Sequence, residues 1–385
     1  MKRIRILSLI LCLCFVPAAW GQKVTCPGEN FNWNEFHTID MLRSNPCETV
    51  LGVDNVGNLT LLWSYTTGNR VESSPAVVNG VVYIGSDDGN LYALNASTGA
   101  LLWSYSYNQD AYVFDSPAVA DGTVYIEMAA VLFALNAETG ALLWSDAIDM
   151  ANSPPTVANG VLYTGGYLGN LYALNPSTGA QLWSYDTGFG IFSSPAVENG
   201  VVYAASANGN LYAVKASTGA LLRGYNINGG GWSSPAVADG VVYVGSTDND
   251  VYALKAKTGA KLWSYTTGDE VTSSPAVANG TVYIGSWDGN VYALNASTGA
   301  LLWSYATGNV VTSSPAVANG VVYVGSWDNN LYALDAATGA VLWSYATGGS
   351  IDSSPVVANG VVYFGSYDGN VYAFGLPSSS VKSGK

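Results

Sequence analysis

The chain has 385 residues, of which 49% are hydrophobic and 10% charged, and it contains 44 glycines. This composition is typical of a β-rich, turn-rich folded protein and excludes a disordered chain. The formal net charge is −14, and it becomes −17 when the basic residues Lys2, Arg3 and Arg5 are removed. A surface this acidic repels nucleic acid and anionic membranes, whereas it suits solubility, cationic partners or divalent cations.

Residues 1–21 are predicted to be a secretory signal peptide. Lys2, Arg3 and Arg5 form a basic start, and the apolar stretch over 6–17 is too short to cross a bilayer comfortably. Ala19-Trp20-Gly21 is an acceptable small-x-small cleavage site. No later stretch is a transmembrane candidate, so we expect a periplasmic or secreted protein without a membrane span.

The cysteines predict one structural crosslink. Cys12 and Cys14 lie in the apolar stretch behind large residues, where a lipid-attachment signal needs small ones, so no lipid anchor is expected. Signal removal leaves Cys26 and Cys47, and an even pair in an exported protein predicts a disulfide in the extension 22–58. Two isolated cysteines also exclude CxxC zinc sites, c-type haem and iron–sulfur clusters.

A unit of about forty residues repeats almost verbatim after residue 58, and a period near 40 with strand-like content predicts a propeller or another closed array. Positions that are identical in every copy are explained by the repeated fold, so function is expected where copies differ. One proline marks each of the eight units, at Pro75, Pro117, Pro155, Pro195, Pro235, Pro275, Pro315 and Pro355.

Each unit is expected to form four antiparallel strands, because runs of β-branched and aromatic residues alternate with turn residues. Asn319-Gly320 is typical of a type I′ hairpin turn, which requires positive φ at both central residues. In the copy that contains this turn, the expected strands A, B, C and D cover 313–318, 321–326, 330–336 and 340–348.

The two ends of the repeat are complementary. The first recognisable strand, 61–65, is of type D, whereas the last unit stops after its C strand at 371–374. The first strand is therefore expected to complete the last blade, which closes the ring and removes its open edge. The sequence predicts an all-β, eight-bladed propeller over 59–376, with a disordered Ser/Lys-rich tail at 377–385.

A second motif, Ala-x-Asn/Asp-x-x-Thr-Gly-x-x-x-Trp, first spans Ala93 to Trp103. It resembles the tryptophan-docking motif of the propellers of pyrroloquinoline quinone (PQQ)-dependent dehydrogenases and their non-catalytic relatives. The resemblance covers roughly 55–375, and it implies that each indole docks between neighbouring blades. Arg223 stands where one unit should have its tryptophan. The expected docking residues are Trp63, Trp103, Trp144, Trp183, Trp263, Trp303 and Trp343.

The variable loops supply the candidate functional surface. The A–B turns are nearly uniform, whereas the D–A loops and B–C turns, on the opposite face of a propeller, differ from unit to unit. Loops on a rigid scaffold are where binding residues gather, although some of these residues would be ordinary solvated positions. The candidate binding residues are Arg70, Glu72, Asp110, Tyr112, Asp149, Phe192, Trp232, Asp269, Glu270, Trp287, Trp327 and Asp352.

An enzyme is the main alternative to a binding module. The resemblance implies a PQQ- and Ca²⁺-dependent alcohol or sugar dehydrogenase, but this chain has no adjacent cysteines of the kind that contact the quinone in catalytic relatives. Arg70 is the one basic residue on the variable rim, whereas PQQ carries three carboxylates. The single histidine, His37, lies outside the repeats, which argues against Ser-His-Asp chemistry. No catalytic residue and no metal ligand are assigned.

These patterns favour an exported, monomeric binding or scaffold propeller, without a cofactor, that recognises a protein or a small ligand with its loop face. By resemblance, its functional analogue is the propeller subunit of the bacterial outer-membrane protein assembly machinery. A carbohydrate-binding propeller is the third reading, because aromatic rims stack on sugars and acidic clusters hold Ca²⁺. Nucleic acid is not an expected partner, because the charge of the chain repels it.

Overall fold

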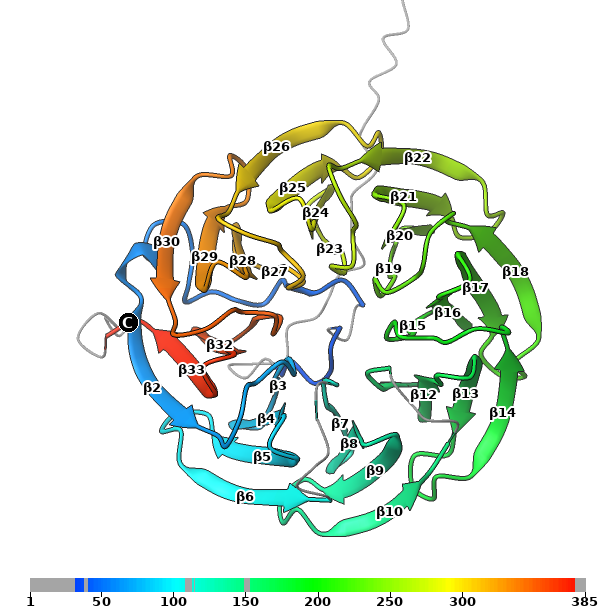
Figure 1. Cartoon of the computed structure of the whole chain (residues 1–385), viewed down its shortest axis with the longest axis horizontal. Coiled ribbons are helices and arrows are strands. Elements are labelled where there is room, and N and C mark those ends of the chain that lie inside the picture. Colours follow the sequence, from blue (N-terminus) through cyan, green and yellow to red (C-terminus); the bar gives the residue numbers. More distant parts are fainter. Residues whose placement is uncertain (1–31, 38–40, 108–112, 114, 149–152, 378–385) are drawn as a thin grey trace, which may run out of the picture.

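Eight four-stranded blades, one of them extended by a short fifth strand, surround a central axis in the computed structural model, which describes residues 32–37, 41–107, 113, 115–148 and 153–377 (Figure 1). Every sheet runs from a short inner strand to a long outer strand, and the pairing within each blade is antiparallel. The all-β, eight-bladed propeller predicted from the repeat is confirmed. The predicted signal peptide and nearly all of the predicted tail lie outside the described residues.

The blades are numbered from the first inner strand. Blades 1 and 2 consist of β3 (Ala76–Val78), β4 (Val81–Ser86), β5 (Asn90–Asn95), β6 (Leu101–Ser106) and β7 (Ala118–Ala120), β8 (Thr123–Met128), β9 (Val131–Asn136), β10 (Leu142–Asp146). Blades 3 and 4 consist of β11 (Thr156–Ala158), β12 (Val161–Gly165), β13 (Asn170–Leu174), β14 (Gln181–Asp186) and β15 (Ala196–Glu198), β16 (Val201–Ser206), β17 (Asn210–Lys215), β18 (Leu221–Asn226).

The second half of the ring repeats this order. Blades 5 and 6 consist of β19 (Ala236–Ala238), β20 (Val241–Gly245), β21 (Asp250–Lys255), β22 (Lys261–Thr266) and β23 (Ala276–Ala278), β24 (Thr281–Gly285), β25 (Asn290–Asn295), β26 (Leu301–Ala306). Blades 7 and 8 consist of β27 (Ala316–Ala318), β28 (Val321–Gly325), β29 (Asn330–Asp335), β30 (Val341–Ala346) and β31 (Val356–Ala358), β32 (Val361–Gly365), β33 (Asn370–Gly375), β2 (Thr60–Thr66).

Strand β2 closes the ring. It pairs antiparallel with β33, in a register that runs from Thr60 opposite Gly375 to Thr66 opposite Asn370. The predicted complementarity of the chain ends is therefore confirmed, and blade 8 has no missing strand. The predicted hairpin turn also forms, because Asn319 and Gly320 have φ values of 42° and 80°.

Tryptophans of the outer strands connect neighbouring blades. The indole Nε1 of Trp63 donates to the Ala96 carbonyl of blade 1 at 2.9 Å, and the ring fills the space that a Cβ on Gly99 would need. Trp103, Trp144, Trp183, Trp263 and Trp303 make the same type of bond to Ala137, Pro176, Ala216, Ala296 and Ala336. Trp343 packs edge-on against Phe374, with ring centroids 5.0 Å apart.

The unit without this tryptophan uses a tyrosine instead. Arg223 is exposed on β18, and two residues later the Tyr225 hydroxyl donates to the Ala256 carbonyl at 2.8 Å. Tyr225 is almost fully buried and lies against Gly259, as Trp63 lies against Gly99. The contact between blades 4 and 5 thus survives the loss of the indole.

The N-terminal segment, residues 32–37 and 41–48, lies at the centre of the ring (Figure 1). Trp33 exchanges two backbone hydrogen bonds with Val77 of β3, at 2.8 and 2.6 Å. β1 (Ser44–Asn45) pairs parallel with β27, and a 3₁₀ turn, η1 (Val56–Asn58), precedes β2. Because the inner strands are sheet edges, this pairing satisfies backbone groups that would otherwise face the channel.

Arg43 anchors this segment within the channel. It is fully buried, and its guanidinium donates to the carbonyls of Pro315 and Pro355 at 3.1 Å each and to the carbonyl of Phe36. Burial lowers the pKa of Arg43 to about 9, which still leaves it charged at neutral pH. Burial, and then the charge of Arg43, lowers the pKa of His37 to about 3, so this imidazole is neutral.

Candidate ligand-binding cup on the loop face

Two variable positions per unit converge at one mouth of the channel. The first lies three residues before the marker proline and is occupied by Glu72, Phe192, Trp232, Thr272, Thr312 and Asp352 among the described residues. The second follows strand B and is occupied by Asp87, Ala129, Tyr167, Ala207, Thr247, Trp287, Trp327 and Tyr367. The fold therefore presents two rings of different side chains on one face.

A cavity of about 490 Å³, here called the cup, opens at this mouth. Phe36 of the N-terminal segment and the serines of the Ser-Ser-Pro repeats line it, together with five of the predicted binding residues. Those five are Arg70, Glu72, Phe192, Trp232 and Asp352.

A belt of serines surrounds the cup. At six junctions between blades, the backbone N–H of one second serine donates to the hydroxyl of the next, at 2.8–3.1 Å. The belt is interrupted in blade 3, where Pro154 has neither the hydroxyl nor the N–H. Blades 2 and 3 are therefore the irregular part of the wall.

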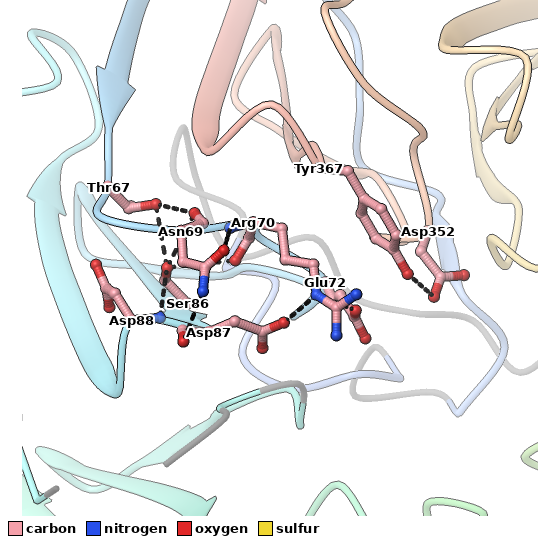
Figure 2. A network of polar contacts seen from close by, with 9 residues as sticks. All are labelled: Thr67, Asn69, Arg70, Glu72, Ser86, Asp87, Asp88, Asp352 and Tyr367. Carbon is pink, nitrogen blue, oxygen red and sulfur yellow. Dashed lines mark hydrogen bonds and ion pairs between the residues drawn. The ribbon is translucent and has the colours of Figure 1, made fainter. Parts of the chain in front are cut away.

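An acidic sector, defined as Glu72, Asp87, Asp115 and Asp352, occupies the cup and its wall in blades 8, 1 and 2. Figure 2 shows Arg70 within the part contributed by blades 8 and 1. The Arg70 Nε lies 2.8 Å from Glu72 Oε1 and also pairs with Asp87, whose Oδ1 is buried without a hydrogen-bond partner among the described residues. The guanidinium carbon is 5.3 Å from the ring centroid of Tyr367, whose hydroxyl donates to Asp352 at 3.3 Å.

The carboxylates of this sector are electrostatically crowded. Burial raises the pKa of Glu72, and the charges of Asp87 and Asp352 raise it further. Burial also raises the pKa of Asp352, although hydrogen bonds from Thr312 and other side chains partly offset this effect. Because Arg70 is the one cation among the described lining residues, the cup has an excess of negative charge.

Blade 2 adds a buried carboxyl pair that the sequence analysis did not single out. Glu127 stands where the other units have glycine or alanine, and it accepts hydrogen bonds from Thr164 Oγ1 at 2.6 Å and Ser153 N at 3.1 Å. Burial raises the pKa of Asp115 to about 7. Burial, and then the charge of Asp115, raises the pKa of Glu127 well above its usual range. The sequence could have revealed Glu127, because it is the single charged residue at its position among the eight units.

An aromatic sector, defined as Tyr167, Phe192 and Trp232, occupies the rim in blades 3 to 5. Phe192 and Trp232 stack with centroids 4.3 Å apart and planes 12° apart, and Tyr167 meets Phe192 at 5.9 Å. The Trp232 side chain remains 50% exposed, so its outer surface is free to contact a ligand.

The other predicted residues lie outside the cavity wall. Trp287 and Trp327 form an aromatic row beside it, with centroids 6.2 Å apart, and their indoles donate to Thr272 and Thr312 at 2.8 Å. Asp269 is exposed, and its carboxylate accepts from the Glu270 backbone N–H. Asp110, Tyr112 and Asp149 lie outside the described residues, as does Cys26, whereas Cys47 is disulfide-bonded.

A larger cavity of about 840 Å³ lies on the opposite face, between the N-terminal segment and the A–B turns. Asn159, Asn199, Asn279 and Asn319 recur there because they form the hairpin turns, so most of this wall repeats the blade. The cup is the better candidate site, since its wall differs from blade to blade.

The cup does not fit PQQ. A quinone with three carboxylates would face the acidic sector, and Glu72 and Asp87 already engage Arg70. Among the described residues, no group of three or more histidine, cysteine, aspartate or glutamate side chains is placed to hold a metal ion. No helix of the described part is long and apolar enough to span a membrane.

The closed ring of eight blades, the indole contacts between them and the site at one axial mouth define an eight-bladed propeller of the PQQ-like repeat class. The family model described as outer membrane protein assembly factor BamB matches residues 49–147, 128–222, 168–310 and 226–382. The chain belongs to this family.

Curated relatives match only part of this chain. The quinone-type alcohol dehydrogenase subunit of Gluconobacter oxydans is 36% identical over 115 residues, which cover 26% of this chain and 15% of that protein. The quinoprotein ethanol dehydrogenase of Pseudomonas aeruginosa is 30% identical over 111 residues, covering 24% and 18%. The chain thus spans less than a fifth of these relatives.

Solved structures share the fold over most of the chain. BamB from Moraxella catarrhalis aligns with a TM-score of 0.71 at 22% identity, covering 82% of this chain and 99% of that one. A europium-containing methanol dehydrogenase aligns with a TM-score of 0.76 at 15% identity, covering 90% and 98%. At these identities the likeness establishes the architecture alone.

Proposed function

We propose that this chain is an exported, non-catalytic binding or scaffold protein that holds a partner at the cup of its loop face. One observation carries the proposal: in a chain of nearly identical units, the position three residues before the marker proline varies, and all six of its described side chains line one cavity. Repeated positions are needed to build the blades, so side chains that vary at one mouth are those available for recognition.

Export and a protein partner are part of the same proposal. The segment 1–21 has the features of a signal peptide, and the matching family is described as an outer membrane protein assembly factor. We further propose that the chain acts as a monomer, because the closed ring leaves no unpaired outer strand at its ends.

A carbohydrate ligand is the second candidate. The observation that favours it is the stacked pair of Phe192 and Trp232, whose exposed aromatic surface is suited to a sugar ring. The acidic sector does not require a sugar, so we rank this candidate below a protein partner.

A binding screen tests the proposed function. Random peptides displayed on phage and an array of glycans would be probed with the purified mature chain. Binders should be retained by Lys257→Ala, which alters an exposed residue in a C–D turn on the opposite face. They should lose about 30-fold in affinity with Trp232→Ala, as expected for an aromatic anchor. Binders that respond to Lys257→Ala and not to Trp232→Ala would refute the proposal.

The enzyme alternative needs a separate measurement. PQQ with Ca²⁺ would be titrated calorimetrically into the mature chain, beside an assay of alcohol and sugar oxidation with an artificial acceptor. We expect neither stoichiometric quinone binding nor turnover, because the acidic sector repels the carboxylates of PQQ. Stoichiometric binding with turnover would overturn the assignment as a binding protein.

A further inference from the structure

We propose that the cup receives a cationic side chain, the guanidinium or ammonium group of an arginine or lysine in an extended segment of a partner protein. The cation would lie against the acidic sector, and the residue beside it would contact the aromatic sector. This inference deepens the proposed function and rests on it, since it names the chemistry of the partner at the same cup.

The charge balance of the cup is the first argument. Glu72 and Asp352 line the cavity, and Asp87 pairs with the guanidinium of Arg70. Glu72 and Asp87 pair with Arg70, Asp352 lies on the far side of Tyr367, and the charges of Asp87 and Asp352 disfavour ionisation of Glu72. A second cation would relieve this repulsion, whereas an anionic or neutral group would leave it in place.

Arg70 itself indicates what kind of group the cup accommodates. Its guanidinium pairs with Glu72 and Asp87 and lies over the ring of Tyr367, while the side chain stays 44% exposed. Planar guanidinium groups combine bidentate pairing with stacking on aromatic faces, which is what this wall provides. Asp352, on the far side of Tyr367, presents a further carboxylate to an incoming cation.

The opposite wall supplies contact for an apolar neighbour. Phe192 and Trp232 stack on each other, which restrains both rings before a ligand covers them and reduces the side-chain entropy lost on binding. An aromatic residue next to the cation, or the aliphatic stem of the cation itself, would bury the exposed surface of Trp232.

The surroundings of the cup favour a protein over a free organic cation. Large apolar side chains stay exposed in the loops that carry the aromatic sector, with Phe189 61%, Leu168 62% and Tyr167 53% exposed. An apolar rim that continues beyond the cavity is typical of a protein interface, because a small ligand would leave it uncovered.

Binding of short peptides to the full mature chain tests this inference. Three acetylated and amidated tetrapeptides would be titrated by fluorescence anisotropy, with tyrosine followed by arginine, citrulline or glutamate between terminal glycines. The arginine peptide should bind at least tenfold more tightly than the citrulline peptide, and the glutamate peptide should not bind. The advantage of arginine should fall as salt concentration rises, because part of the attraction is electrostatic.

Matched variants separate the cup from the general charge of the surface. Glu72→Gln and Asp352→Asn should each weaken the arginine peptide about tenfold while leaving the citrulline peptide nearly unchanged. Asp269→Asn is the control, because it removes one exposed carboxylate from the same face outside the cavity wall. Its effect should stay below twofold, and thermal melting would confirm that each variant is folded.

Each contrary outcome overturns a stated part of the idea. Equal affinity for the arginine and citrulline peptides would overturn the inference that the cup binds a cationic side chain. An equal loss of affinity for the arginine peptide in Asp269→Asn and Glu72→Gln would overturn it as well. Both results would leave the proposed binding function of the loop face in place. Binding of n-butylguanidinium as tightly as the arginine peptide would overturn the choice of a protein partner. Library binders that map to the opposite face would overturn both the proposed function and this inference.

Discussion

The buried carboxyl pair of blade 2 makes the stability of the protein depend on pH. The pKa of Asp115 rises from 3.8 to about 7 on folding, so the folded state holds a proton that the unfolded chain releases between these values. The free energy of unfolding contributed by this group is complete below about pH 4 and is lost as the pH rises through 7. A shift of this size corresponds to about 4 kcal/mol.

Asp115→Ser removes this contribution together with the part of the Glu127 pKa shift that the charge of Asp115 causes, and serine fits the blade because it occupies the same position in the other seven units. Urea unfolding of wild type and variant would be compared at pH 4.5 and 7.5. From pH 4.5 to pH 7.5, the free energy of unfolding of the wild type should fall by up to about 4 kcal/mol more than that of Asp115→Ser. Glu35 and His37, whose pKa values move to about 8 and about 3, titrate in both proteins and cancel in the difference.

The control is Asp121→Asn, which removes an exposed carboxylate from the A–B turn of the same blade and keeps a residue that tolerates its positive φ. The free energy of unfolding of this variant should change with pH in the same way as that of the wild type. Parallel profiles for Asp115→Ser and the wild type would refute the reasoning, because they would show that Asp115 is ionised in the folded protein at neutral pH.

Three further predictions concern the scaffold. Tyr225→Phe should lower the free energy of unfolding by about 1 kcal/mol, and Arg223→Ala by less than 0.5 kcal/mol, because only the tyrosine hydroxyl bonds to blade 5. Thermal melts would compare the stability of the two variants. Equal destabilisation would contradict the conclusion that Tyr225 replaces the docking tryptophan between blades 4 and 5. Arg43→Ala should lower the free energy of unfolding by at least about 3 kcal/mol, since it leaves buried carbonyls unpaired. A melting temperature unchanged from the wild type would contradict the conclusion that Arg43 anchors the N-terminal segment. Non-reducing peptide mapping should recover Cys47 joined to Cys26, and Cys47→Ser should cost about 2–4 kcal/mol; a different partner for Cys47 would exclude the predicted pairing.

Local signals explain why the ring was predictable. Asn319-Gly320 and its counterparts specify hairpins within a few residues, and the marker prolines count the blades directly. The pairing of β2 with β33 followed from the same count of units, because the chain begins with an extra D strand and the last unit lacks one. The predicted A strands were too long, since the serines before Ala316 bond to neighbouring blades and leave three residues for pairing.

Features that depend on contacts across the ring were not predictable. Arg43 looks like any polar residue of an irregular extension, and its acceptors in the blades, at Pro315 and Pro355, lie 272 and 312 residues away. Five candidate residues meet in the cup, but sequence alone gave no reason to separate them from Asp269, which lies outside its wall. Glu127 was missed because the reasoning followed loops, whereas this residue lies within strand β8.

The contacts of Arg43 also bear on the order in which the chain can assemble. The guanidinium is synthesised first, yet its acceptors at Pro315 and Pro355 emerge from the ribosome 272 and 312 residues later. Strand β2 is likewise synthesised long before its partner strand β33. Arg43 and β2 therefore lack these partners until the eighth blade exists, so completion of the ring is a late event that shorter nascent chains cannot reach.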